Sequence, residues 1–181
     1  DTTEQKDALK KALGIPKENK VVLYLGRVSQ EKNIDEIMGY LDSYMNSYSN
    51  ITFLVVGDGP YKSTLEKNAK SLKYRKQMIF AGAKPWDEIT HYYQIADVFV
   101  SASTSETQGL TYIEALASGV PVVARKDQCL EGVLLQGENG YVFEDEEGFL
   151  SGLTQVLWNE NGVDYSQNAI NSVEKFSTEN F

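Results

Sequence analysis

Residues Val98–Val123 read VFVSASTSETQGLTYIEALASGVPVV, and this stretch predicts a strand, a polar loop, a helix and a second strand in succession. The apolar run Val98–Val100 marks the first strand, and it ends just before the polar loop. Gly119 followed by Pro121 forms a helix-stop signal, after which a second apolar run begins. Strand, helix and strand in such close succession indicate an α/β protein.

The predicted helix carries an apolar stripe and a glutamate. Leu110, Ile113 and Ala117 recur at spacings of three and four, so we expect them to face the core. Glu114 falls on the same stripe, where a carboxylate needs partners. Helical side chains lean toward the N-terminus of their helix, so Glu114 would reach back toward the loop that holds Glu106. Two carboxylates would then meet near free helix amides that favour an anion, which outlines a ligand site.

Short apolar runs rich in β-branched residues recur along the chain, and segments with helical periodicity lie between most of them. The predicted strands are Val21–Leu25, Ile51–Val56, Met78–Ala81, Val98–Val100, Val122–Ala124 and Tyr141–Phe143. Fully apolar strands that alternate with helices favour a parallel sheet covered on both faces, and right-handed crossovers make it doubly wound. We therefore expect an α/β fold with a Rossmann-like parallel sheet of about six strands and helices on both faces. Residues 1–181 would form a single domain.

Composition excludes several classes of protein. The chain has 17 basic and 26 acidic residues, a formal net charge of −9, and no basic patch interleaved with aromatic residues stands out. Binding to nucleic acid or to an anionic membrane is therefore not expected of this chain alone. The single cysteine, Cys129, and the single histidine, His91, predict neither an internal disulfide nor a zinc site. No apolar run approaches membrane-spanning length.

The expected topology places two cations at the predicted ligand site. If the strand order is 3-2-1-4-5-6, the order reverses between the first and fourth strands, and ligands bind there at the carboxyl ends. Arg27 and Lys32 follow the first strand, while the loop with Glu106 follows the fourth. A guanidinium and an ammonium group beside helix-terminal amides suit a phosphate or a diphosphate.

Several motifs together resemble one enzyme family. They are Gly26-Arg27 with Lys32 five residues later, Gly57-Asp58-Gly59-Pro60, Phe80-Ala81-Gly82, and Glu106 and Glu114 before Ala117-Ser118-Gly119-Val120-Pro121-Val122. In this order and spacing, the chain from about Val21 to Phe143 resembles the carboxyl-terminal, donor-binding half of a GT-B enzyme, a retaining glycosyltransferase of family 4. Both the fold and the cation site agree with this resemblance.

The resemblance implies roles for individual residues. Arg27 and Lys32 would hold the donor diphosphate, and with Glu106, which would contact the transferred sugar, they would form the catalytic set. Glu114 would bind the ribose hydroxyls. The further donor-binding residues implied are Gly26, then Ala83 and Lys84 in the loop that meets the base, and Gln108, Gly109, Leu110 and Thr111, whose backbone would hold phosphate or sugar oxygens. No metal or other cofactor is expected, because the two cations and the helix dipole would take a metal ion's place.

The sequence from Glu106 to Glu114, ETQGLTYIE, departs from the commoner form of this motif, Glu-Gly-Phe-Gly-Leu-Pro. It more closely resembles glucosyltransferases of Gram-positive bacteria that act on diacylglycerol or on cell-surface glycans. The resemblance thus implies UDP-glucose as donor and a lipid or glycan as acceptor. It also implies an N-terminal acceptor-binding domain absent here, so this chain would be an inactive half of a longer enzyme. That enzyme would be cytoplasmic, at the inner face of the plasma membrane, with no nucleic-acid partner.

Three other functions deserve comparison with this one. A nucleotide-sugar epimerase shares the GT-B architecture, and a sugar-nucleotide-binding module without turnover would carry the same site; both alternatives stay open. A dinucleotide-binding enzyme could use Asp58, at the end of the second strand, for a ribose. However, that class needs a Gly-x-Gly-x-x-Gly turn after the first strand, and residues 25–30 read LGRVSQ.

Overall fold

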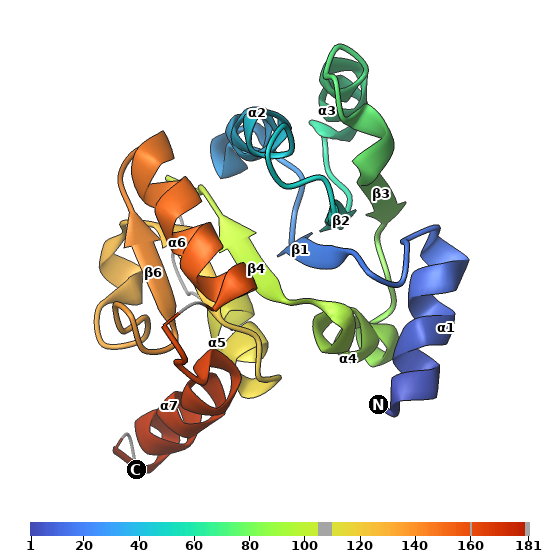
Figure 1. Ribbon diagram of the computed structural model, residues 1–181. Coiled ribbons are helices and arrows are strands. Elements are labelled where there is room, and N and C mark those ends of the chain that lie inside the picture. The colour runs from blue at the N-terminus through green and yellow to red at the C-terminus, as the bar shows by residue number, and fades with distance from the viewer. Residues whose placement is uncertain (105–109, 160, 180–181) are drawn as a thin grey trace.

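The computed structural model describes residues 1–104, 110–159 and 161–179 of the chain. Six parallel strands form one sheet in the order β3-β2-β1-β4-β5-β6 (Figure 1). The strands are β1 (Lys20–Leu25), β2 (Ile51–Val56), β3 (Met78–Gly82), β4 (Val98–Ser101), β5 (Val122–Arg125) and β6 (Gly140–Phe143). The predicted strands are confirmed, because each observed strand end lies within one residue of the expected one. The observed order of the strands is also the predicted one.

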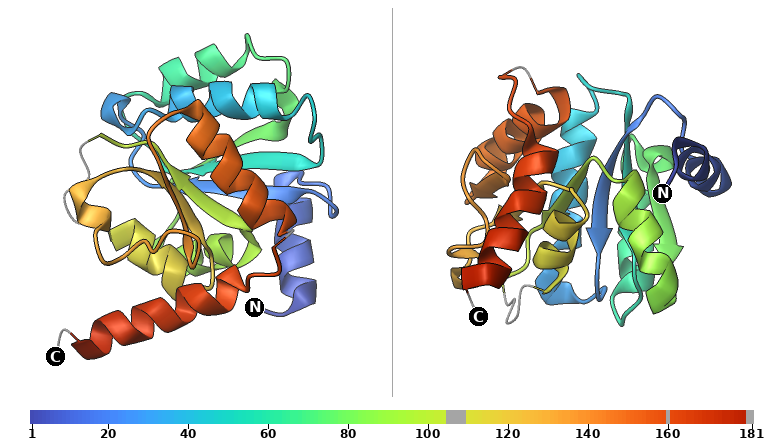
Figure 2. Two further views of the ribbon diagram at one scale, coloured as in Figure 1. Left: turned by 60° about the vertical axis from the view of Figure 1, so that its left-hand side comes forward. Right: turned by 90° about the horizontal axis from the view of Figure 1, so that it is seen from below.

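Helices cover both faces of the sheet, which confirms the doubly wound fold (Figure 1; Figure 2). One face carries α2 (Ile34–Tyr44), α3 (Lys62–Ala69) and α6 (Glu146–Trp158), and the other carries α1 (Thr3–Leu13), α4 (Trp86–Ile95), α5 (Leu110–Ala117) and α7 (Tyr165–Glu179). Short 3-10 turns are η1 (Gln30–Lys32), η2 (Arg75–Gln77) and η3 (Gln128–Leu130). None of the described helices is both long and apolar enough to span a bilayer.

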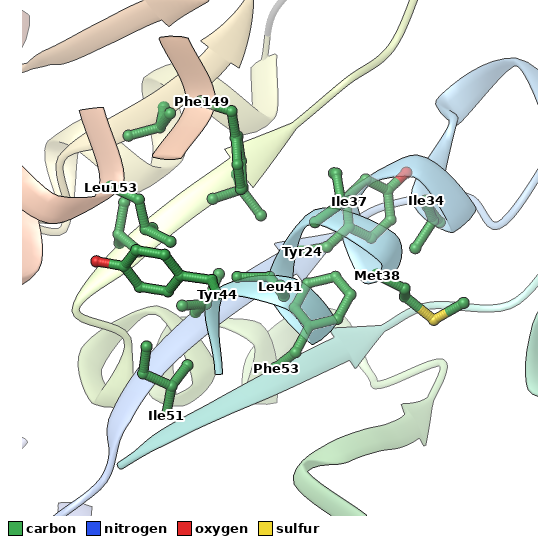
Figure 3. Close-up of a cluster of buried hydrophobic side chains, with 14 of the residues drawn as sticks. Tyr24, Ile34, Ile37, Met38, Leu41, Tyr44, Ile51, Phe53, Phe149 and Leu153 are labelled. Atoms are coloured by element: carbon green, nitrogen blue, oxygen red, sulfur yellow. The ribbon is translucent and has the colours of Figure 1, made fainter. Parts of the chain in front are cut away.

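The core lies in two layers, one on each side of the sheet. Side chains alternate along a strand, so Val22 and Tyr24 of β1 pack under α2 while Leu23 packs against the helices of the opposite face. Figure 3 shows the first of these layers, where Tyr24 and Phe53 of the sheet lie close to side chains of α2. Since both faces are covered, every residue of β2 is buried, which explains the unbroken apolar runs in the sequence.

The buried face of α5 differs from the predicted one. Leu110 is 56% exposed and Ala117 is exposed, so they do not form the core-facing stripe. The residues of α5 that are buried are Tyr112, Ala115 and Leu116. These also follow helical spacing, and Tyr112 tolerates burial because its hydroxyl donates a 3.0 Å hydrogen bond to Ser101 Oγ. The predicted stripe was therefore wrong, and Glu114 lies off the buried face of the helix.

Candidate functional site at the carboxyl edge of the sheet

The strand order reverses where the sequence predicts it. β1 pairs with β2 on one side and with β4 on the other, so the chain turns in opposite directions after these two central strands. The segments that follow them, residues 26–33 and 102–104, leave the sheet at its carboxyl edge. Open α/β sheets bind ligands at such a reversal point, and we take this edge as the candidate site.

Backbone hydrogen bonds hold the loops after β1, β2 and β3 together. Gly26 N donates to Val56 O at 3.0 Å, and Gly57 N donates to Gly82 O at 2.9 Å. Val28 N donates to Asp58 O at 3.0 Å, so the loop after β1 lies directly against the loop after β2. The three loops therefore form one rigid surface.

Two glycines of the Gly-Asp-Gly-Pro motif permit this close approach. A Cβ atom on Gly57 would lie 1.8 Å from the carbonyl oxygen of Gly26, and one on Gly59 would lie 2.2 Å from that of Val28. Gly57 also has a φ of 146°, which disfavours residues with a side chain. The motif is more than a turn, because it allows two loops of the site to touch.

Arg27 and Lys32, the two predicted cations, lie in the segment after β1. The Arg27 side chain is exposed and Lys32, at the end of η1, is half-buried. Between them, Ser29 Oγ donates a 2.8 Å hydrogen bond to Glu31 Oε1, and this bond lowers the pKa of Glu31, helped less strongly by the charges of Lys32 and Arg27. Thr104 N donates to Glu31 O at 3.3 Å, so the segment after β4 contacts the turn that carries both cations.

Asn33 and Arg125 fix the segment after β4 through one carbonyl oxygen. Asn33 Nδ2 donates to Ala102 O at 2.9 Å, and Arg125 Nε donates to the same oxygen at 3.2 Å. Arg125 also forms an ion pair with Glu36 on α2, with 2.5 Å between Nη2 and Oε2. Neither Asn33 nor Arg125 was among the predicted site residues. Arg125 is the last residue of β5, and a charged residue that ends a central parallel strand is the signal that indicates it.

Glu114 is half-buried on α5, and no described residue donates a hydrogen bond to its carboxylate. Burial raises the pKa of Glu114. Across the helix pair, burial and then the charge of Glu114 raise the pKa of Tyr93 on α4, whose hydroxyl donates a long 3.4 Å hydrogen bond to Thr111 O. The carboxylate is thus partly withdrawn from water, and a hydrogen bond from a hydroxyl group of a ligand would offset the cost of that burial.

Replacing Glu114 with glutamine is expected to stabilise the fold at neutral pH. When folding raises the pKa of a carboxyl group, the fold loses stability as pH rises from the unfolded pKa, near 4.5, through the folded pKa. Glutamine removes that loss, so Tm should rise at neutral pH and be unchanged below pH 4.5. Thermal melting of both proteins against pH measures this, and a lower Tm at neutral pH would contradict it.

The remaining predicted site residues lie at the same edge or outside the described residues. Gly26 follows β1, Ala83 and Lys84 follow β3, and Leu110 and Thr111 begin α5. Lys84 Nζ lies 5.9 Å from the centre of the Tyr92 ring. Glu106, Gln108 and Gly109 lie outside the described residues.

A groove elsewhere on the surface is separate from this edge. This groove, at the amino edge, runs between α1, the turn before β4 and the turn before β5, and none of the predicted site residues lines it.

Within the described part of the chain, no three His, Cys, Asp or Glu side chains gather as a metal site would require. Metal-free binding stays a prediction.

Comparison with known proteins identifies the family. Residues 5–176 match the model described as "Glycosyl transferases group 1". Alpha-monoglucosyldiacylglycerol synthase of Acholeplasma laidlawii is 39% identical over 158 residues, which cover 87% of this chain and 40% of that protein. The protein of the same name from Streptococcus pneumoniae is 37% identical over 149 residues, which cover 82% of this chain and 34% of that protein. The chain therefore spans well under half the length of these relatives.

Solved structures agree on the fold. The crystal structure of Anabaena Alr3699/HepE in complex with UDP-glucose superimposes with a TM-score of 0.84 at 22% identity, over 97% of this chain and 49% of that one. The pneumococcal O-GlcNAc transferase GtfA in complex with UDP and GlcNAc gives a TM-score of 0.77 at 20% identity, over 97% of this chain and 41% of that one. The fold is the one found in GT-B glycosyltransferases. Because residues 5–176 of the 181-residue chain match this family model, the chain belongs to the group 1 glycosyl transferases.

Proposed function

We propose that this chain is the donor-binding domain of a retaining hexosyltransferase that uses UDP-glucose and transfers glucose to a lipid or glycan. The observation that carries the proposal is the contact between the turn that holds Arg27 and Lys32 and the segment after β4, where Thr104 N donates to Glu31 O at 3.3 Å at the reversal point of the sheet. The two relatives named as glucosyldiacylglycerol synthases support glucose as the sugar and a lipid as the acceptor. Their greater length leaves room for an acceptor-binding N-terminal domain, and the complete enzyme would work at the inner face of the plasma membrane.

In this proposal the chain's own residues stabilise the leaving group. Arg27 and Lys32 bind the diphosphate oxygens, and backbone amides of α5 add further donors where negative charge develops. No metal ion is required, because these groups supply the positive charge. Glu114 accepts hydrogen bonds from the ribose hydroxyls, and Glu106 contacts the sugar. Asn33 and Arg125 act as positioning residues, because they hold the Ala102 carbonyl in the segment that leads to Glu106.

Titration calorimetry of the 181-residue chain with UDP-, GDP- and ADP-glucose tests the donor. We expect the UDP compound to bind most tightly, and a preference for GDP- or ADP-glucose would contradict the choice of base. The isolated chain should transfer no sugar, because catalysis needs a second domain to exclude water from the reacting centre. Transfer by the purified chain to a lipid or glycan acceptor would overturn the half-enzyme proposal, and release of free UDP without a glycosylated product would favour an epimerase.

Replacing Glu106 and replacing Glu114 with glutamine should have different effects on UDP binding and on turnover. Glu114→Gln should weaken binding of UDP to this chain about tenfold, because a charge-assisted bond to the ribose becomes a neutral one. Glu106→Gln should leave UDP binding nearly unchanged and lower turnover in the full-length enzyme. Glutamine keeps the size and hydrogen-bonding atoms, so charge is the main variable. Loss of UDP binding in Glu106→Gln, with normal binding in Glu114→Gln, would reverse the two assignments.

A further inference from the structure

The charge of this acidic chain is unevenly distributed. Residues 62–76 contain six of the 17 basic residues and only one of the 26 acidic ones, Glu66. This basic segment, Lys62–Lys76, therefore has a net charge of +5, and the rest of the chain has a net charge of −14. The expectation that this chain alone does not bind an anionic membrane did not take this local excess of basic residues into account.

The basic segment lies at one edge of the molecule. It comprises α3, the following turns and most of η2, and it connects β2 to the edge strand β3 (Figure 1). Its five exposed cations are Lys67, Lys70, Lys73, Arg75 and Lys76. Four of these recur at every third residue, and they lie on the part of the connection that returns toward the amino edge of the sheet. They are therefore separate from the candidate donor site at the carboxyl edge.

Contacts with α2 and the following loop hold the segment in place. Asp42 accepts hydrogen bonds from the backbone of Tyr74 at 2.8 Å and of Lys73 at 3.4 Å. Gln77 Nε2 donates to the carbonyl oxygens of Ser49 and Ile51 at 2.6 and 2.7 Å. The exposed cations are thus presented by a fixed backbone, so binding to them costs little ordering entropy of the main chain.

The exposed cationic side chains of this segment are not paired with carboxylates, although the Asp42 carboxylate lies against its backbone. None of the five exposed cations forms an ion pair with a residue of the described chain, whereas Lys17, Arg125 and Lys126 elsewhere do. Lys73 Nζ donates instead to a neutral group, Asn46 Oδ1, at 3.0 Å. A patch of this kind attracts an anionic partner, since its exposed cationic side chains form no ion pairs within the described chain.

We propose that the basic segment Lys62–Lys76 is a docking surface for a bilayer rich in anionic lipid. Clusters of about four to eight Lys and Arg at a membrane surface are typical of binding to anionic lipid. At physiological salt, exposed charges more than about 8 Å apart are largely screened from each other. The acidic remainder of the chain therefore does not cancel the attraction between this face and a membrane that it touches. Nucleic acid fits less well: single strands need exposed aromatic rings for stacking, and Tyr74 is half-buried with its hydroxyl bonded to Asn46. This docking surface is independent of the proposed sugar transfer.

Vesicle sedimentation of the 181-residue chain tests the proposal. The chain should sediment with phosphatidylglycerol vesicles at low salt, and neither with phosphatidylcholine vesicles nor with phosphatidylglycerol vesicles at high salt. The triple variant K67Q/K70Q/K76Q should bind phosphatidylglycerol about a hundredfold more weakly, because each cation near an anionic membrane strengthens attachment roughly fivefold. None of these three side chains has a described hydrogen bond or ion pair, so folding should be unaffected, and a thermal melt checks this.

The control variant K11Q/K17Q/K126Q removes three exposed lysines outside the basic segment and so changes the net charge equally. It should bind phosphatidylglycerol vesicles like the unaltered chain. Equal loss in both triple variants would overturn the proposal, because net charge would then explain binding. No binding of the unaltered chain to phosphatidylglycerol would overturn it as well. If the chain binds a single-stranded oligonucleotide as tightly as it binds phosphatidylglycerol vesicles, and K67Q/K70Q/K76Q weakens both, the partner is a polyanion in general. That result would overturn the proposal of a membrane-specific surface.

Discussion

Replacing Arg27 with alanine is expected to weaken binding of UDP to this chain by about ten- to a hundredfold while leaving uridine binding unchanged. The hypothesised partner of Arg27 is the diphosphate, which uridine lacks, and a charge-assisted hydrogen bond contributes about 1.5–3 kcal/mol. The side chain is exposed, so the substitution should not disturb the fold. Tyr24 donates its 2.7 Å hydrogen bond to the backbone carbonyl of Arg27, and alanine keeps that carbonyl.

Titration calorimetry with UDP and with uridine measures both affinities. Arg75→Ala is the matched control, because Arg75 is also exposed but lies in η2, away from the carboxyl edge; it should leave both affinities unchanged. Arg27→Lys should restore part of the UDP affinity, since lysine keeps the charge but loses the paired donors of the guanidinium. If Arg27→Ala weakens uridine and UDP equally, Arg27 contacts the nucleoside or shapes the loop instead.

Replacing Gly57 with alanine is expected to destabilise the fold by about 3 kcal/mol or more and to abolish UDP binding. The added Cβ would lie 1.8 Å from the carbonyl oxygen of Gly26, and no side-chain movement relieves a contact with backbone. The loops after β1 and β2 would have to separate, and this moves Arg27 away from the rest of the site. A loss of this size lowers Tm by about 10 °C.

Gly39→Ala is the control for Gly57→Ala. Gly39 is an exposed residue within α2, and a Cβ there would meet nothing within 4 Å. Alanine at an open helical position should stabilise the chain by about 0.5–1 kcal/mol, because glycine is a poor helix former. Melting curves compare the two variants. A Tm of Gly57→Ala close to that of the unaltered chain would show that the two loops of the site are not held in contact.

Strand positions, strand order and the position of Arg27 and Lys32 at the carboxyl edge could be predicted from the sequence. A strand covered on both faces must be apolar at every position, so Ile51–Val56 is apolar throughout and both its ends agree with the prediction. Alternation of such runs with helices determines the doubly wound topology, and the topology places Arg27 and Lys32 beside the end of β4. These features depend on neighbours along the chain, which the sequence contains directly.

Other features depended on contacts between different elements of the fold. The buried face of α5 was mispredicted because Tyr112 becomes a core residue only when Ser101, on a neighbouring strand, accepts its hydroxyl. Asn33 and Arg125, which are 92 positions apart (125 − 33), both donate a hydrogen bond to the Ala102 carbonyl. Likewise, a basic segment presents its charge to a partner only where the fold forms no ion pairs with its side chains. Periodicity and composition identify elements and local charge, whereas pairings between distant side chains arise only when the sheet brings them together.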